Sequence, residues 1–185
     1  MLIALSKLSS TQTKGTEAVK NLIASQLLNY CATHPNAVLQ YRASDMILHI
    51  HSDTAYLNET EARSRVGGHH FLGDNNNPVN QPKNGSILDI AKILKHVVSS
   101  AAEAELGATF LNGKEAVVIR TTLAKMGHLQ PATPMQVDNS TVNSILNGTV
   151  KQQRSRAMDM RFYWMKDCTQ QKASSTFSWC LDATI

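Results

Sequence analysis

Three acidic residues occupy positions from which carboxylates could converge on a cation. Asp53 ends a strand-like segment, Asp138 ends another just before a predicted helix, and Glu105 lies in the first two turns of the longest helical pattern. Groups at the carboxyl ends of neighbouring strands face the crevice where α/β proteins bind ligands. Three carboxylates in one cleft repel one another unless a cation neutralises them. Oxygen ligands alone favour Mg²⁺ or Mn²⁺ over zinc, so we predict a metal site suited to phosphoryl chemistry.

Glu103 has a local explanation that Glu105 lacks. Ser100 and Glu103 have the spacing of a capping box, in which the hydroxyl and the carboxylate each bind a backbone N–H at the helix start. Glu105 lies about 200° around the helix from Glu103. It is therefore either a solvated surface residue or a group directed at something cationic. A single Asp at a strand end is more often a turn or cap residue, so only the combination of three acids favours a metal site.

Histidines offer a second arrangement. His49, His51 and Asp53 fall on one face of the same predicted strand, in the His-x-His pattern that some zinc hydrolases use. No further ligands converge on them in the sequence, so the oxygen-ligand site is favoured. His69 and His70 point to opposite faces of a strand, and at most one of them could join a site.

The strands and helices that must position these residues are predicted from the spacing of apolar residues and from the Gly and Pro residues that interrupt it. Alternating or apolar runs predict five strands, at residues 46–53, 65–72, 86–98, 134–138 and 176–181. Helical spacing predicts helices at residues 16–33, 99–126, 139–146 and 156–170. The glycine pair 67–68 predicts a bend or bulge in the second strand.

The order βββ-α-β-α-α-β predicts an α/β domain with a mixed sheet flanked by helices. The helix at residues 16–33 lies outside this pattern, and we interpret it as an appended N-terminal helix. We expect residues 1–15, rich in Ser and Thr, to be loosely ordered. The predicted organisation is an N-terminal appendage at residues 1–43 and an α/β domain at residues 44–185.

Composition sets wider limits. The 185 residues are 42% hydrophobic, enough for one core, and the net charge of +4 permits nucleic-acid binding without requiring it. Three cysteines, an odd number without metal-type spacing, argue against a secreted disulfide framework. No signal-peptide core or run of about 20 apolar residues is evident. We expect an intracellular protein, cytoplasmic or nuclear, that is neither secreted nor bound to a membrane.

Five motifs in order resemble the ribonuclease H domain of copia-type LTR retrotransposon polyproteins. They are Ser-Asp-Thr-Ala-Tyr-Leu at 52–57, Arg-Ser-Arg-Val-Gly-Gly at 63–68, Ser-Ser-Ala-Ala-Glu-Ala-Glu-Leu at 99–106, Asp-Asn-Ser-Thr at 138–141 and Arg-Ser-Arg-Ala-Met-Asp-Met-Arg-Phe-Tyr at 154–163. Residues 28–35, Leu-Asn-Tyr-Cys-Ala-Thr-His-Pro, resemble the end of the reverse transcriptase connection in the same family. The resemblance covers roughly residues 16 to 172.

This resemblance implies a ribonuclease H fold and cleavage of the RNA strand of an RNA–DNA hybrid with Mg²⁺ or Mn²⁺, two ions in the complete family site. Asp53, Glu105 and Asp138 match the first three catalytic, metal-binding acids, and Asp159 matches a structural position. The family's fourth carboxylate lies beyond the last strand, and Asp182 is too close to that strand to replace it. The resemblance thus implies a C-terminally truncated, impaired domain, whose other partner is the reverse transcriptase region of its polyprotein.

A basic segment lies near this predicted site. Residues 151–172 hold six Lys or Arg against two Asp. An ordinary solvated helix face is one explanation; beside a nuclease cleft we favour phosphate contacts, made by Lys151, Arg154, Arg156 and Arg161. Selectivity for a hybrid would come from groove shape and 2′-hydroxyl contacts. Two other functions stay open: a catalytically dead retroelement remnant that only binds nucleic acid, and a histidine-metal hydrolase.

Overall fold

A computed structural model describes residues 1–75, 83–146, 159–170 and 179–183. The chain divides into two compact units, Met1–Gln40 and Tyr41–Ile185, which are described separately. None of the helices within the described residues is long and apolar enough to cross a membrane.

The first unit consists of two helices, α1 (Leu2–Lys14) and α2 (Glu17–Thr33). The expectation of a loosely ordered N-terminus was wrong, because residues 2–14 contain no Gly or Pro and their hydroxyls bond within the helix. Ser10, for example, donates to the carbonyl of Lys7 at 2.8 Å. The expected helix from residue 16 is confirmed, and it ends where the N–H of His34 bonds the carbonyl of Tyr30, just before a proline.

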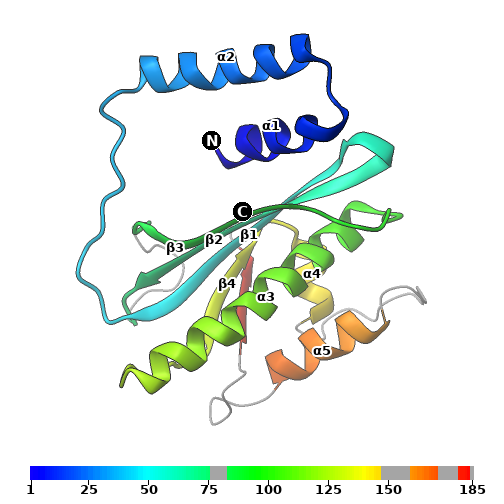
Figure 1. The fold of residues 1–185 in the computed structure, drawn as a ribbon. Helices are drawn as coiled ribbons and strands as arrows, with labels where there is room; N and C mark the ends of the chain where they lie inside the picture. Colours follow the sequence, from blue (N-terminus) through cyan, green and yellow to red (C-terminus); the bar gives the residue numbers. More distant parts are fainter. Residues whose placement is uncertain (76–82, 147–158, 171–178, 184–185) are drawn as a thin grey trace. The chain divides into compact units, whose positions relative to one another are not determined.

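The second unit is a five-stranded sheet with helices, in the predicted order βββ-α-β-α-α-β (Figure 1). The strands lie side by side as β3-β2-β1-β4-β5; β1–β2 and β2–β3 are antiparallel, whereas β1–β4 and β4–β5 are parallel. The strands are β1 (Ile47–Glu59), β2 (Arg63–Gly73), β3 (Ser86–Ile93), β4 (Thr133–Val137) and β5 (Trp179–Ala183). The helices are α3 (Ala101–Lys125), α4 (Ser140–Leu146) and α5 (Asp159–Gln170), with a short 3-10 turn at Thr60–Ala62.

Strand β1 is longer than its sequence predicted, and Asp53 lies inside it. The strand continues because β2 keeps pairing with it, to Ala55 opposite Arg65 and then, after a register shift, to Glu59 opposite Arg63. The bulge therefore falls between residues 55 and 59 rather than at the glycine pair, where the β1–β2 register is continuous. Strand β3 ends at Ile93, five residues before the predicted end, and the predicted residues 176–178 of the last strand lie outside the described part.

The core packs helix α3 against the sheet. Leu48 and Ile50 of β1 and Met135 of β4 are fully buried in one cluster with Leu106 of α3 and Met165 of α5. Helix α3 contacts β1 and β2, and α4 and α5 contact α3 (Figure 1). This packing holds the helix that carries Glu105 against the strand that carries Asp53.

Candidate metal centre

Asp53 and Asp138 are brought together by the parallel pairing of β1 with β4. Ser52 is the register partner of Val137, the last residue of β4. The next residue on each strand is an aspartate, so the two side chains start from neighbouring backbone positions. Asp53 is thus at the end of the β1–β4 pairing, although β1 itself continues.

Glu105 enters the site from the second turn of α3. The helix begins at Ser100, whose hydroxyl accepts a hydrogen bond from the N–H of Glu103 at 3.1 Å. The carboxylate of Glu103 accepts from both the N–H and the hydroxyl of Ser99 at 2.7 Å. The predicted capping box is therefore present, except that the carboxylate of Glu103 binds Ser99 rather than the N–H of Ser100. These hydrogen bonds hold the side chain of Glu103 at the start of the helix.

The three acids converge. One oxygen of each carboxylate lies within 4.8 Å of those of the other two, with Glu105 buried and both aspartates exposed. Burial, then the negative charges of Asp138 and Asp53, raise the pKa of Glu105 to about 8, whereas hydrogen bonds from Thr54 act in the opposite direction. Oxygen Oε2 of Glu105 is buried without a hydrogen-bond partner. The cluster is therefore strained electrostatically as long as all three carboxylates are ionised.

A hard divalent cation fits this donor set. Three carboxylates supply only oxygen ligands, which suit Mg²⁺ or Mn²⁺. A cation between them would offset the charges of Asp138 and Asp53, which add to the effect of burial on the pKa of Glu105. Among the residues that the structure describes, this is the one group of three or more His, Cys, Asp and Glu side chains that could hold a metal.

The histidines do not join a metal site within the described residues. His49 bonds the carbonyl of Asp74 at 3.2 Å and stacks on Phe71. The Nδ1 of His69 lies 2.8 Å from Asp89, and burial lowers the pKa of His51 to about 4. The His-x-His zinc arrangement is therefore not supported: these rings pack against one another and Phe71 instead.

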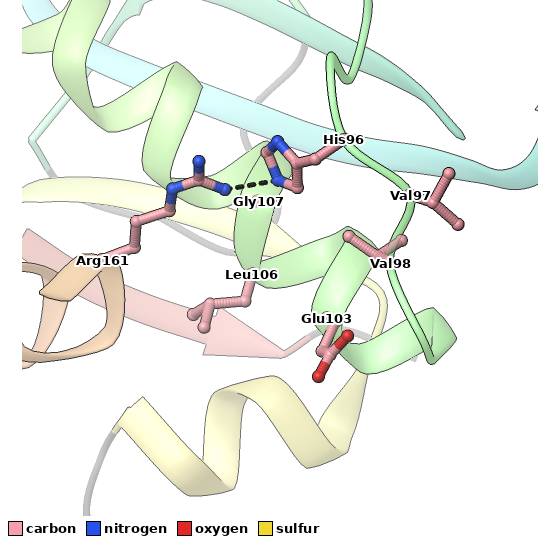
Figure 2. A pocket seen from close by; sticks show the side chains of 7 residues that line it. All are labelled: His96, Val97, Val98, Glu103, Leu106, Gly107 and Arg161. Atoms are coloured by element: carbon pink, nitrogen blue, oxygen red, sulfur yellow. Dashed lines mark hydrogen bonds between the residues drawn. The ribbon is translucent and has the colours of Figure 1, made fainter. Parts of the chain in front are cut away.

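Arg161 is half-buried rather than free in solvent. Its guanidinium donates to Nε2 of His96 at 2.5 Å (Figure 2) and lies 5.7 Å above the ring of Phe110. Arg161, His96, Glu103 and Leu106 line one small pocket. Arg161 thus contributes to the packing of α5 on α3. Lys151, Arg154 and Arg156 lie outside the described residues, and Asp159 begins α5.

Sequence reasoning missed Asn112. It is fully buried in α3, and its amide nitrogen donates to the hydroxyl of Ser52 and the carbonyl of Gly67. A usable signal was present: Asn112 follows Glu105 by seven residues, two helical turns, so both lie on the same face of the helix.

Comparisons with known proteins give a fold likeness. LC11-RNase H1, isolated from compost by a metagenomic approach, aligns with a TM-score of 0.53 and 9% identity over 75% of this chain and 84% of that one. LC11-RNase H1 in complex with an RNA/DNA hybrid aligns with a TM-score of 0.49 and 8% identity, over 74% of this chain and 85% of that one. The N-terminal RNase H domain of rv2228c from Mycobacterium tuberculosis aligns with a TM-score of 0.46 and 10% sequence identity, over 75% of this chain and 83% of that one.

No family model matches the sequence, and no curated protein matches it. The likeness to LC11-RNase H1 and the element order show that the described part of the second unit has a ribonuclease H-like α/β fold with a mixed sheet. This confirms the fold class that the sequence predicted.

Proposed function

We propose that this chain is the ribonuclease H-like domain of a copia-type LTR retrotransposon polyprotein, which hydrolyses the RNA strand of RNA–DNA hybrids with Mg²⁺ or Mn²⁺. The observation that carries the proposal is the meeting of Asp53, Glu105 and Asp138, with carboxylate oxygens within 4.8 Å of one another. These are the three positions that the motif resemblance assigns to catalytic acids, and they come from two strands and a helix far apart in the sequence.

Each acid has a distinct part in this proposal. Asp53 and Asp138, exposed, would hold divalent ions from the solvent side, and Glu105 would complete the ligand set from the buried side. A bound divalent ion supplies Lewis acidity and an activated water for phosphodiester hydrolysis. Glu105 holds a proton at neutral pH in the apo protein, since its pKa is about 8. That proton is released when the carboxylate becomes a ligand, because ligating groups must be deprotonated.

The hybrid substrate and the protein partner are inferred from the motif resemblance. Lys151, Arg154, Arg156 and Arg161 would contact the phosphate backbone, which dominates affinity for nucleic acids. The first unit, Met1–Gln40, holds the segment that resembles the reverse transcriptase connection, and the reverse transcriptase region would be the neighbour within the polyprotein.

We expect cleavage by these 185 residues to be weak. The family's two-ion site uses a fourth carboxylate from beyond the last strand, whereas three carboxylates gather among the described residues here. Two ions held about 3.5–4 Å apart stabilise both the attacking and the leaving oxygen, so a site with fewer ligands is expected to act poorly.

The test is release of labelled RNA from an RNA–DNA hybrid by residues 1–185 in Mg²⁺ or Mn²⁺. Asp138→Asn is the control, with single-stranded RNA and duplex DNA as comparison substrates. Weak, hybrid-specific cleavage that disappears in Asp138→Asn would support the proposal. Hybrid binding without any cleavage in either ion would instead identify a remnant that only binds nucleic acid.

A further inference from the structure

Asn112 joins the helix that carries Glu105 to both strands at the level of Asp53. Its Nδ2 donates to the hydroxyl of Ser52 at 2.9 Å and to the carbonyl of Gly67 at 3.0 Å. Ser52 directly precedes Asp53 on β1, and Gly67 is the register partner of Asp53 on β2. One side chain therefore binds the residue next to Asp53 and the residue opposite it.

A second contact joins β1 to α3 on the other side of Asp53. The hydroxyl of Thr54, the residue after Asp53, donates to the carbonyl of Ala104, the residue before Glu105, at 3.3 Å. Both chain neighbours of Asp53 are thus bonded to α3, at points about 12 Å apart along the helix axis. Two contacts at different heights fix the rotation and the sliding of α3 against β1, and hence the position of Glu105 relative to Asp53.

Gly68 explains how Asn112 fits between helix and sheet. A Cβ at Gly68 would lie 1.9 Å from Oδ1 and 2.8 Å from Cγ of Asn112. The amide of Asn112 therefore occupies the space that any side chain at position 68 would take. The glycine pair thus has two uses: Gly67 offers a carbonyl to Asn112, and Gly68 leaves space for it.

We propose that Asn112, together with Gly68, is a positioning residue of the metal centre, which holds Glu105 at the distance from Asp53 that divalent-ion binding requires. This inference rests on the proposed function, because it assigns the ion site to the same three acids. Outer partners of metal ligands commonly change metal affinity about 10- to 100-fold when replaced.

The experiment measures Mn²⁺ affinity by calorimetry on the full chain without nucleic acid, alongside thermal unfolding. The test variant is Asn112→Ala, and the matched control is Arg120→Met. Arg120 is also buried and also bonds α3 to the β4 side of the sheet, through the carbonyl of Gln130 and the hydroxyl of Thr133. It lies 15 residues after Glu105, about 22 Å along the helix.

We expect both variants to lower Tm, but only Asn112→Ala to weaken Mn²⁺ binding, by about 10- to 100-fold. Gly68→Ala should weaken Mn²⁺ binding in the unaltered chain and add little in the Asn112→Ala background, because the methyl group then meets no amide. Such non-additivity is the sign of a direct contact.

Three results would decide against the inference. A folded Asn112→Ala that binds Mn²⁺ as the unaltered chain does would overturn it and leave the proposed function intact. If Asn112→Ala fails to fold, Gly68→Ala, which displaces the amide of Asn112, and Ser52→Ala, which removes the accepting hydroxyl, replace it, and an unchanged affinity in both has the same meaning. The proposed function itself fails if the unaltered chain does not bind Mn²⁺, or if Asp138→Asn binds it equally well.

Discussion

Asp53 on β1 and Asp138 directly after β4 occupy equivalent positions, each one residue beyond the last register pair of these two parallel strands. Parallel strands carry equivalent positions side by side, so the two carboxylates meet although 84 residues of chain separate them. Glu105 then reaches the same place from α3. The following predictions test the electrostatics and the roles of these residues.

The contribution of Glu105 to the stability of the apo protein should fall as the pH rises from 6.5 to 8. The pKa of Glu105 is about 8 in the folded chain against an ordinary value of 4.5. At Glu105 the folded state therefore binds more protons than the unfolded state between these values, and the stability that this group contributes falls as pH rises. From pH 6.5 to 8 the expected loss is roughly 1 to 2 kcal/mol.

Thermal or urea unfolding in EDTA measures this loss. Burial also lowers the pKa values of His49, His51, His70 and His96, so just above pH 6.5 these rings bind more protons in the unfolded state and add stability as the pH rises. The contribution of Glu105 is therefore the difference in unfolding free energy between the unaltered chain and Glu105→Gln. The unaltered chain should lose stability relative to Glu105→Gln as the pH rises, and saturating Mn²⁺ should reverse the direction of this difference. A difference between these two proteins that does not change with pH would contradict the raised pKa.

Asp138→Asn should lower the pKa of Glu105 more than Asp53→Asn does. Among the charges that raise this pKa, Asp138 contributes more than Asp53. Carboxyl ¹³C shifts of Glu105 followed against pH measure the difference directly. Both substitutions should also weaken Mn²⁺ binding by about 10-fold or more, and equal effects on the pKa would show that the two aspartates are equivalent.

Glu103→Ala and Glu105→Ala should separate stability from catalysis. Glu103 caps α3 through Ser99, so its loss should cost about 1 kcal/mol of folding free energy and leave hybrid cleavage unchanged. Glu105→Ala should abolish cleavage and Mn²⁺ binding. Urea unfolding and the hybrid assay on the two variants measure both quantities; loss of cleavage in Glu103→Ala without unfolding would reverse the assignment.

Replacing Lys151, Arg154 and Arg156 together by Gln should weaken hybrid binding and flatten its salt dependence. Each lost phosphate contact lowers the slope of log affinity against log salt by roughly 0.9 for duplex DNA. Fluorescence anisotropy over a range of KCl concentrations gives the slope. Arg161→Gln should in addition lower Tm, because this side chain bonds His96 and lies over Phe110. An unchanged slope in the triple variant would indicate an ordinary solvated face.

The sequence by itself predicted the order of the elements in the α/β domain and the three acids that the structure brings together. Local features were sufficient: alternating apolar residues for the strands, a capping box for the start of α3, and an acid directly after a strand pattern at Asp53 and Asp138. The helix at residues 2–14 was not predicted, because its Ser and Thr content is typical of a loop. In the structure, hydroxyls of these residues bond carbonyls within the helix instead.

Only the tertiary structure decided where the long-range contacts fall. Strand β1 runs past Asp53 because β2 continues to pair with it, and an isolated strand pattern contains no information about its partner's length. The pKa of Glu105 depends on its burial and on the charges of Asp138 and Asp53, which come from distant parts of the chain. The contact of Asn112 with Ser52 and Gly67 joins residues 60 and 45 positions apart, and such contacts exist only once helix and sheet have packed.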